Sequence, residues 1–258
     1  MIFCDSHIHL VHCEFSGEEK LFREKNDSRC ITNFCFAREW EEWERDSSFS
    51  STPGLVFKSF GIHPQACSED FMRGGFGREL SFLEALLLEG KIDAVGECGF
   101  DFFTKEYKAA EANQEVAWKA QVELCIRYGT PLVVHLRKAM EKIFRDSRLL
   151  SRVRAVVFHS FPGTLLEAKS ILNHGVNAFF SLGKPILNGK KSAIDCVGNL
   201  PLERILLETD APYQTLKGEE STFPSDIVRV YERAAKIRGQ EIGFLCEKIS
   251  ENFMKIMI

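Results

Sequence analysis

Short apolar runs alternate along the chain with longer segments in which apolar residues recur at helical spacing. Eight of the runs show little alternation of polar and apolar residues, which is typical of strands buried on both faces of a parallel sheet. These runs are Met1–Asp5, Cys30–Phe36, Leu55–Phe60, Ile92–Val95, Leu132–Val134, Ala155–Phe158, Asn177–Phe180 and Ile205–Leu207. We therefore expect eight buried, parallel strands.

Helix signals lie between the later runs. Gly90 and Gly129 supply C-terminal stops for two helices, and Thr164 with Glu167 three residues further on forms a capping-box pattern at the start of a third. Helices are predicted at Glu79–Glu89, Ala109–Tyr128, Thr164–Asn173, Pro224–Ile237 and Gly239–Ile258.

This order of elements favours an α/β fold, a TIM-like (β/α)8 barrel. The chain has 258 residues, and barrels of this kind often form one domain of about 250 residues. We expect a single domain over residues 1–258, with an open doubly wound sheet as the alternative. The first two units give the weakest helical pattern, because Phe15–Asn26 and Arg38–Ser51 are short and charged.

Composition and charge narrow the class of protein. The chain has 33 basic and 37 acidic residues and a net charge of −4, which argues against a protein that coats nucleic acid through its overall charge. No apolar run approaches the ~20 residues of a membrane span, and Met1–Asp5 lacks the features of a secretory leader. The nine cysteines are scattered without a CxxC pair, so we expect reduced thiols in a cytoplasmic protein with no membrane partner.

Histidines gather where the predicted strands end. Five of the seven lie just past the C-terminal end of a strand, which in a barrel is the face where active sites assemble. Positions i and i+2 of a strand project to the same side, so the first two of these imidazoles can reach one metal ion. The five are His7, His9, His63, His135 and His159, whereas His12 and His174 are expected in a loop and at a helix end.

Two carboxylates follow strands in the same way. Glu97 and Asp210 come after buried apolar runs, where a carboxylate needs either a salt bridge or a metal ion. With four histidines they form a nitrogen and oxygen ligand set suited to Zn, Mn or Fe, with Mg possible. Six ligands exceed the needs of one zinc ion and fit two ions about 3.5–4 Å apart, bridged by one carboxylate.

Other residues near the strand ends have two interpretations each. His63 could hold a substrate oxygen or be a turn histidine, and Arg137 could clamp a phosphate or pair with a neighbouring acid. Asp101 could orient a ligand or cap the next helix. Lys184 could add to the attraction of phosphate. The acidic stretch Glu39–Asp46 is expected to be a solvated face, and the tryptophans within it are expected to pack.

Six motifs in this order resemble the TatD family of metal-dependent deoxyribonucleases, in the amidohydrolase superfamily. The motifs cover nearly the whole chain: Asp5–His9, Gly61–Pro64, Gly96–Asp101, Pro131–Arg137, His159–Gly163 and Glu208–Tyr213. The resemblance implies a TIM-like barrel with two divalent ions, of Mg, Mn or Zn. By the family pattern the first ion is bound by His7, His9 and Asp210, the second by His135 and His159, with Glu97 bridging and with His63 and Arg137 in the phosphate region.

The resemblance also implies hydrolysis of DNA phosphodiesters, often as a 3′–5′ exonuclease. In such a mechanism Asp210 would accept a proton from the attacking water, and a pit at the barrel top would suit single-stranded or frayed DNA ends. This chain departs from the family at Gln65, Ser160, Pro162 and residues 214–225, which bears on the substrate and not on the ligands. A hydrolase of a non-nucleic-acid ester, amide or lactone is the alternative, and a non-catalytic binding protein is a third.

Overall fold

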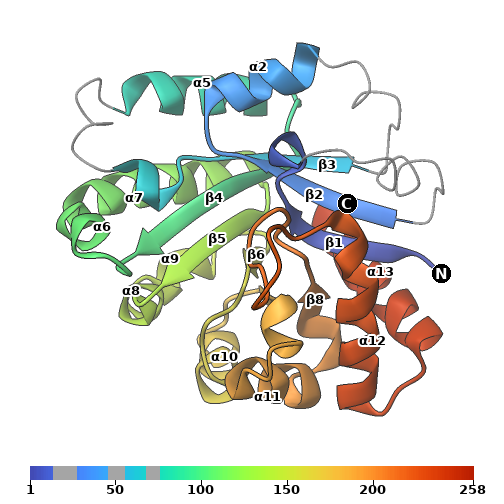
Figure 1. Ribbon diagram of the computed structural model, residues 1–258. Coiled ribbons are helices and arrows are strands. Elements are labelled where there is room, and N and C mark those ends of the chain that lie inside the picture. The colour runs from blue at the N-terminus through green and yellow to red at the C-terminus, as the bar shows by residue number, and fades with distance from the viewer. Residues whose placement is uncertain (14–27, 46–55, 68–75) are drawn as a thin grey trace.

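A computed structural model describes residues 1–13, 28–45, 56–67 and 76–258. Eight strands form one parallel sheet whose spatial order is their order in the chain (Figure 1). The strands are β1 (Phe3–Ile8), β2 (Ser28–Phe34), β3 (Val56–Phe60), β4 (Ala94–Asp101), β5 (Leu132–Arg137), β6 (Val156–Phe158), β7 (Ala178–Leu182) and β8 (Ile205–Leu207). The eight predicted strands are confirmed.

The sheet curls into a nearly closed barrel. The first and last strands are joined just past β8, where Asp210 N donates to His7 O at 3.0 Å and His9 N donates to Ala211 O at 2.8 Å. Sequential strand order with helices between the strands is the topology of a TIM-like barrel. The predicted (β/α)8 barrel is therefore confirmed, and the open doubly wound sheet is excluded.

Helices surround the barrel on its outside (Figure 1). Within the described residues the α-helices are α2 (Ala37–Arg45), α5 (Gly77–Leu88), α6 (Lys105–Ala109), α7 (Glu111–Tyr128), α8 (Met140–Arg145), α9 (Ser147–Leu150), α10 (Leu165–Asn173), α11 (Lys191–Asn199), α12 (Ile227–Arg238) and α13 (Ile242–Met257). Short 3-10 turns are η1 (Leu10–His12), η2 (Pro64–Cys67), η3 (Lys184–Ile186), η4 (Leu202–Arg204) and η5 (Pro224–Asp226). None of the described helices is both long and apolar enough to cross a membrane.

Capping explains several helix boundaries. Thr164 and Glu167 form the predicted capping box at the start of α10, and Gly129 ends α7 in the left-handed conformation with φ of 67°. The charged segment from Arg38 yields α2, whose Trp40 and Trp43 are buried against Phe34, so the packing role expected for the tryptophans is confirmed. The other weak segment, Phe15–Asn26, lies outside the described residues.

Four strands, β1, β4, β5 and β7, run further toward their C-terminal ends than their apolar runs predict. β4 continues to Asp101 and β5 continues to Arg137, because Cys98–Asp101 of β4 pairs with Val134–Arg137 of β5. Gly99 makes this close pairing possible: its φ is 142°, and a Cβ there would collide with the backbone oxygen of His135. Glu97 and His135, which the sequence places past the strand ends, thus lie on β4 and β5 themselves.

Candidate metal centre

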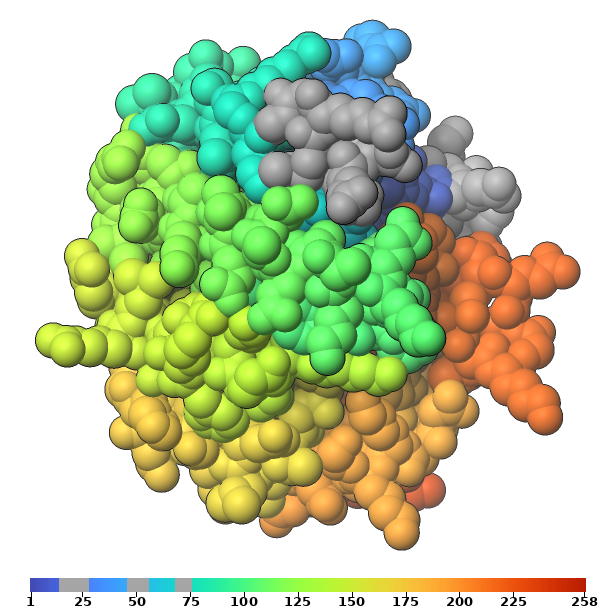
Figure 2. Space-filling model, turned by 90° about the vertical axis from the view of Figure 1, so that its left-hand side faces the viewer, coloured from blue at the N-terminus to red at the C-terminus, as the bar shows by residue number. Residues whose placement is uncertain are grey.

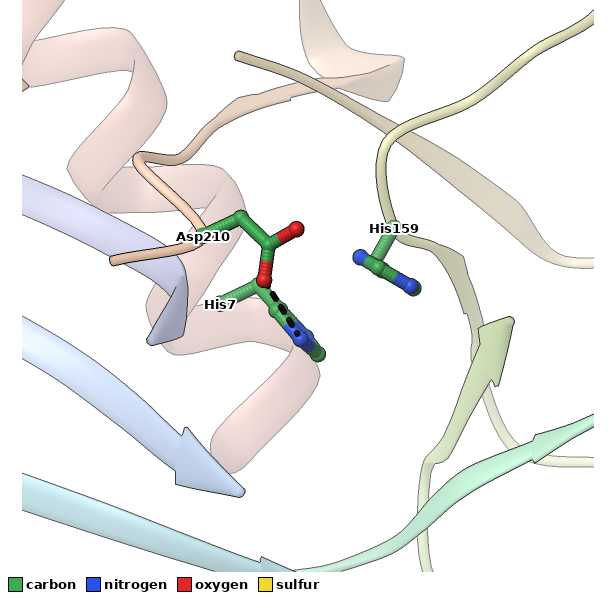
Figure 3. A group of neighbouring side chains, drawn as sticks. All are labelled: His7, His159 and Asp210. Carbon is green, nitrogen blue, oxygen red and sulfur yellow. Dashed lines mark ion pairs between the residues drawn. The ribbon is translucent and has the colours of Figure 1, made fainter. Parts of the chain in front are cut away.

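The predicted ligand residues converge at the C-terminal ends of the strands. They come from β1, β4, β5 and the segments that follow β1, β6 and β8, and the mouth of the barrel contains a cavity of about 740 Å³. Figure 2 looks onto this face, with the segment after β4 (green) in its middle and the segment after β8 (orange) at one side. Figure 3 shows three of the side chains, His7, His159 and Asp210, approaching one another from separate elements.

Glu97 lies at the centre of the cluster. Its Oε1 is 3.2 Å from His7 Nε2 and 3.1 Å from His9 Nε2. Its Oε2 is 2.9 Å from His159 Nε2 and 3.3 Å from His135 Nδ1. The two oxygens of one carboxylate therefore face two separate pairs of imidazoles.

Asp210 lies beside the first imidazole pair. Its Oδ1 is 3.5 Å from His7 Nε2 and 3.6 Å from His9 Nε2, and its Oδ2 accepts a hydrogen bond of 2.7 Å from Gln214 Nε2. The backbone of Asp210 has φ of 59°, in the left-handed region that non-glycine residues seldom occupy. The turn after β8 thus places this carboxylate over the mouth of the barrel.

The carboxylates and imidazoles of the cluster shift each other's pKa values. Burial opposes the charge of Glu97, but the neighbouring His7 and His159 hold the pKa of its carboxyl well below the usual range. Burial likewise opposes a charge on His9, yet its contacts with Asp210 and Glu97 raise its pKa to about 10. The cluster therefore favours ionised carboxylates with positive charge close to them.

The donor set fits divalent metal ions. Ring nitrogens face one another within each pair, at 3.3 Å for His7 Nε2 and His9 Nε2 and at 3.2 Å for His135 Nδ1 and His159 Nε2. Among the described residues, no lysine or arginine lies within 4.0 Å of the Glu97 or Asp210 carboxylate. Converging lone pairs around buried carboxylates call for a cation, and imidazole with carboxylate suits Zn or Mn.

A buried carboxylate behind the cluster, that of Asp101, orients one of the imidazoles. Asp101 Oδ2 is 3.3 Å from His135 Nε2 and accepts a hydrogen bond of 2.8 Å from Gln65 Nε2. A proton on Nε2 leaves the Nδ1 lone pair of His135 pointing toward Glu97. Of the two roles open for Asp101, the structure places it behind a ligand candidate, and Thr104 caps the next helix instead.

His63 and Arg137 lie at different depths. His63 Nε2 is 3.2 Å from His135 Nδ1 and 3.6 Å from Glu97 Oε2, and burial together with His135 lowers its pKa to about 3. Arg137 lines the mouth of the cavity with its side chain 41% exposed, 3.8 Å from Asp101 Oδ2. His63 therefore belongs to the cluster, whereas Arg137 lies at its rim.

Sequence reasoning missed a second histidine network at the rim. His12 is predicted in a loop, but it ends the 3-10 turn η1. Its Nε2 contacts Glu39 Oε1 at 3.1 Å and its Nδ1 contacts the Tyr213 hydroxyl at 2.9 Å. Its ring also stacks on His9, with centroids 5.6 Å apart. Spacing of three residues from His9, about one helical turn, is the signal that could have found it. Glu39 is buried by this pairing, so its assignment to a solvated face is wrong.

Lys184 does not face the cavity. It is fully buried, and its ammonium donates to Glu219, to Thr222 Oγ1 at 2.9 Å and to Asp226 Oδ2 at 3.1 Å. The expectation that it attracts phosphate is wrong, because its charge is already matched by two carboxylates. It instead fastens the segment that follows β8 to the end of β7.

Comparison with known proteins supports one family. The family model described as TatD related DNase matches residues 4–257. A "3'-5' ssDNA/RNA exonuclease TatD" of Edwardsiella piscicida is 31% identical over 209 residues, covering 78% of this chain and 76% of the relative. The crystal structure of YJJV, a TatD homologue from Escherichia coli, superposes with a TM-score of 0.80 at 25% identity, covering 99% of this chain and 97% of that one.

A third protein shares the fold. The structure of a hydrolase TatD family protein from Entamoeba histolytica superposes with a TM-score of 0.76 at 19% identity, covering 100% of this chain and 98% of the other. This chain therefore shares the fold of both solved proteins over nearly its whole length.

Proposed function

Because this chain belongs to the TatD-related DNase family, we propose that it is a metal-dependent hydrolase that cleaves DNA phosphodiester bonds, as a 3′–5′ exonuclease on single-stranded or frayed ends. The observation that carries the proposal is the Glu97 carboxylate, which lies between two imidazole pairs in a cavity at the barrel mouth. The family match favours a DNA phosphodiester as the bond cleaved over the alternative of a non-nucleic-acid ester, amide or lactone. The complete ligand set argues against a non-catalytic binding protein.

The metal centre would take two divalent ions. His7, His9 and Asp210 would hold one, His135 and His159 the other, and Glu97 would bridge them, with Mg, Mn or Zn as candidates. Two bound dications lower the pKa of water and offset the charge of phosphate oxygens.

Other residues of the chain would act on water and substrate. Asp210 reaches over the mouth and would accept a proton from the attacking water. Arg137 and His63 would stabilise negative charge that grows on the phosphoryl oxygens. Asp101 would keep the imidazole of His135 in the tautomer that a ligand needs.

The shape of the site supports a single-stranded end as the substrate. A cavity of about 740 Å³ at the barrel mouth suits a terminal nucleotide. With a net charge of −4, the chain would bind a polynucleotide weakly and in a strongly salt-dependent way. We further propose that residues 1–258 form one domain. We also propose a cytoplasmic location, with which the nine cysteines accord because they form no disulfide.

The test is hydrolysis of end-labelled single-stranded DNA after chelation and restoration of Mg, Mn or Zn. We expect a ladder that shortens from the 3′ end, requires metal and is lost in Glu97→Ala. A Glu79→Ala variant, which removes a carboxylate from the outer helix α5, is the matched control. Absence of cleavage by protein shown to hold two ions per chain would contradict the proposal and favour a carbonyl substrate.

A further inference from the structure

Two cationic side chains rest against a single exposed aromatic ring at the barrel mouth. Phe103 follows β4 and is 52% exposed. The Arg137 guanidinium carbon lies 3.9 Å from the centre of its ring, and the Lys138 ammonium nitrogen lies 4.6 Å from it. Both distances are within the range of cation–π attraction, so the ring holds both cations in place.

The backbone around this ring is fixed by the barrel. Asp101 and Arg137 pair across β4 and β5, and the N–H groups of the next two residues, Phe102 and Phe103, donate to Arg137 O and Asp101 Oδ1, each at 2.8 Å. Lys138 has φ of 56°, a left-handed conformation that is uncommon for lysine and frequent at functional sites. The two cations are therefore carried by rigid strand ends and not by a free loop.

Neither cation has a hydrogen-bonding partner among the residues that the structure describes. Within the described ranges, Asp101 is the only carboxylate within 4.0 Å of the Arg137 side chain, at 3.8 Å, and Lys138 forms no ion pair. The next two cations of the chain behave differently, because Lys142 and Arg145 both donate to the Glu115 carboxylate at 2.6 Å. As far as the described part of the chain is concerned, the donors on the ring are thus available to a ligand.

We propose that Lys138, held on Phe103 beside Arg137, binds the phosphate next to the scissile one and makes the site prefer a polynucleotide to a small phosphodiester. The proposal rests on the proposed function. Arg137 lines the cavity, whereas Lys138 lies on the same ring but does not line it. A strand whose terminal phosphate reaches the cavity would carry its next phosphate across the ring to the lysine.

The test compares two substrates that differ in their number of phosphates. Bis(4-nitrophenyl) phosphate has one phosphodiester, and a short oligothymidylate has several. Lys138→Ala is expected to lower kcat/KM on the oligonucleotide by roughly fivefold, as for one exposed charged contact, and to leave the small diester unaffected. Lys138→Arg should retain the preference. Lys248→Ala removes the same charge from α13 and should leave kcat/KM unchanged on both substrates.

A second readout separates charge from structure. The plot of log(kcat/KM) on the oligonucleotide against log salt concentration should become less steep by about 0.7 in Lys138→Ala, the slope of one phosphate contact on a single strand. Phe103→Leu should also make the plot less steep and should slow the small diester as well, because the same ring holds Arg137. Phe103→Tyr, which keeps the ring, should change neither the slope nor the rates. In Lys138→Ala, equal losses on both substrates or an unchanged slope would overturn the proposal.

Failure of the proposed function gives a different result. Hydrolysis of neither substrate by the unmodified protein would contradict the nuclease assignment. The subsite is then tested by the affinity for a fluorescent oligothymidylate in the metal-loaded protein. The plot of log affinity against log salt concentration should again be less steep by about 0.7 in Lys138→Ala than in the unmodified protein. An equal slope in the two proteins would overturn the proposed role of Lys138.

Discussion

Exchange of Asp101 for asparagine isolates the orienting role of one buried carboxylate. Its Oδ2 accepts from Gln65 Nε2 at 2.8 Å and lies 3.3 Å from His135 Nε2, while its Oδ1 accepts from Phe103 N at 2.8 Å. In either orientation of an asparagine side chain, its NH2 group meets a donor: the Phe103 N–H in one, Gln65 and His135 in the other. In both, the negative charge beside His135 is lost.

The size of the effect follows from this arrangement. Loss of a hydrogen-bonded partner behind a metal ligand typically costs 10- to 100-fold in metal affinity, about 1.4–2.7 kcal/mol. We expect Asp101→Asn to lower the affinity for one of the two bound ions by this factor, because His135 belongs to only one imidazole pair. Isothermal titration of the metal-free protein with Mn or Zn measures both affinities.

A matched variant controls for loss of a carboxylate from the same strand region. Asp93 lies just before β4, at the opposite end from Asp101, and accepts a hydrogen bond of 2.8 Å from Lys58 N. Asp93→Asn should leave both metal affinities unchanged. If Asp101→Asn binds both ions as tightly as the unmodified protein, or weakens both equally, the reasoning about His135 is refuted.

Three further predictions concern the rim, the loop after β8 and the ions. Arg137→Ala should keep its metals but lose roughly 2–4 kcal/mol of transition-state stabilisation on phosphodiesters, measured as kcat/KM by steady-state kinetics; an unchanged rate would leave Arg137 with only its contacts to Asp101 and Phe103. Lys184→Met should lower the free energy of unfolding by about 1–3 kcal/mol in urea, because Glu219 and Asp226 lose a buried cationic partner and keep Arg229 alone; an unchanged midpoint would contradict this. Chelation should lower the melting temperature reversibly, since a ligand at about 1,000 times its Kd stabilises by about 4 kcal/mol; an equal melting temperature without metal would contradict binding of metal by the folded protein.

The strand order and the residues of the cluster could be predicted because both depend on local pattern. Short apolar runs mark strands buried on both faces, and a histidine or carboxylate at the end of each run lands on the same barrel face. This reasoning brought His7, Glu97, His159 and Asp210 to the same mouth, where the structure places them.

The errors concern residues whose partners are distant in sequence. Lys184 is neutralised by Glu219 and Asp226, 35 and 42 positions away, which no local pattern reveals. Glu39 is buried by a contact with His12, 27 residues earlier, although its neighbours read as a solvated acidic face. The apolar run also predicts an end of β4 that is too early, because polar residues inside a barrel mouth resemble the start of a loop.

The most direct test of the account is the number of metal ions per chain measured beside activity. Metal-free protein would be titrated with Mn, with bound metal determined by mass spectrometry and hydrolysis of the oligonucleotide followed on the same samples. The account predicts two ions per chain, activity that rises only as the second ion binds, and loss of both properties in Glu97→Ala. Full activity with one ion per chain, or two ions retained with full activity in Glu97→Ala, would contradict the bridging role of this carboxylate.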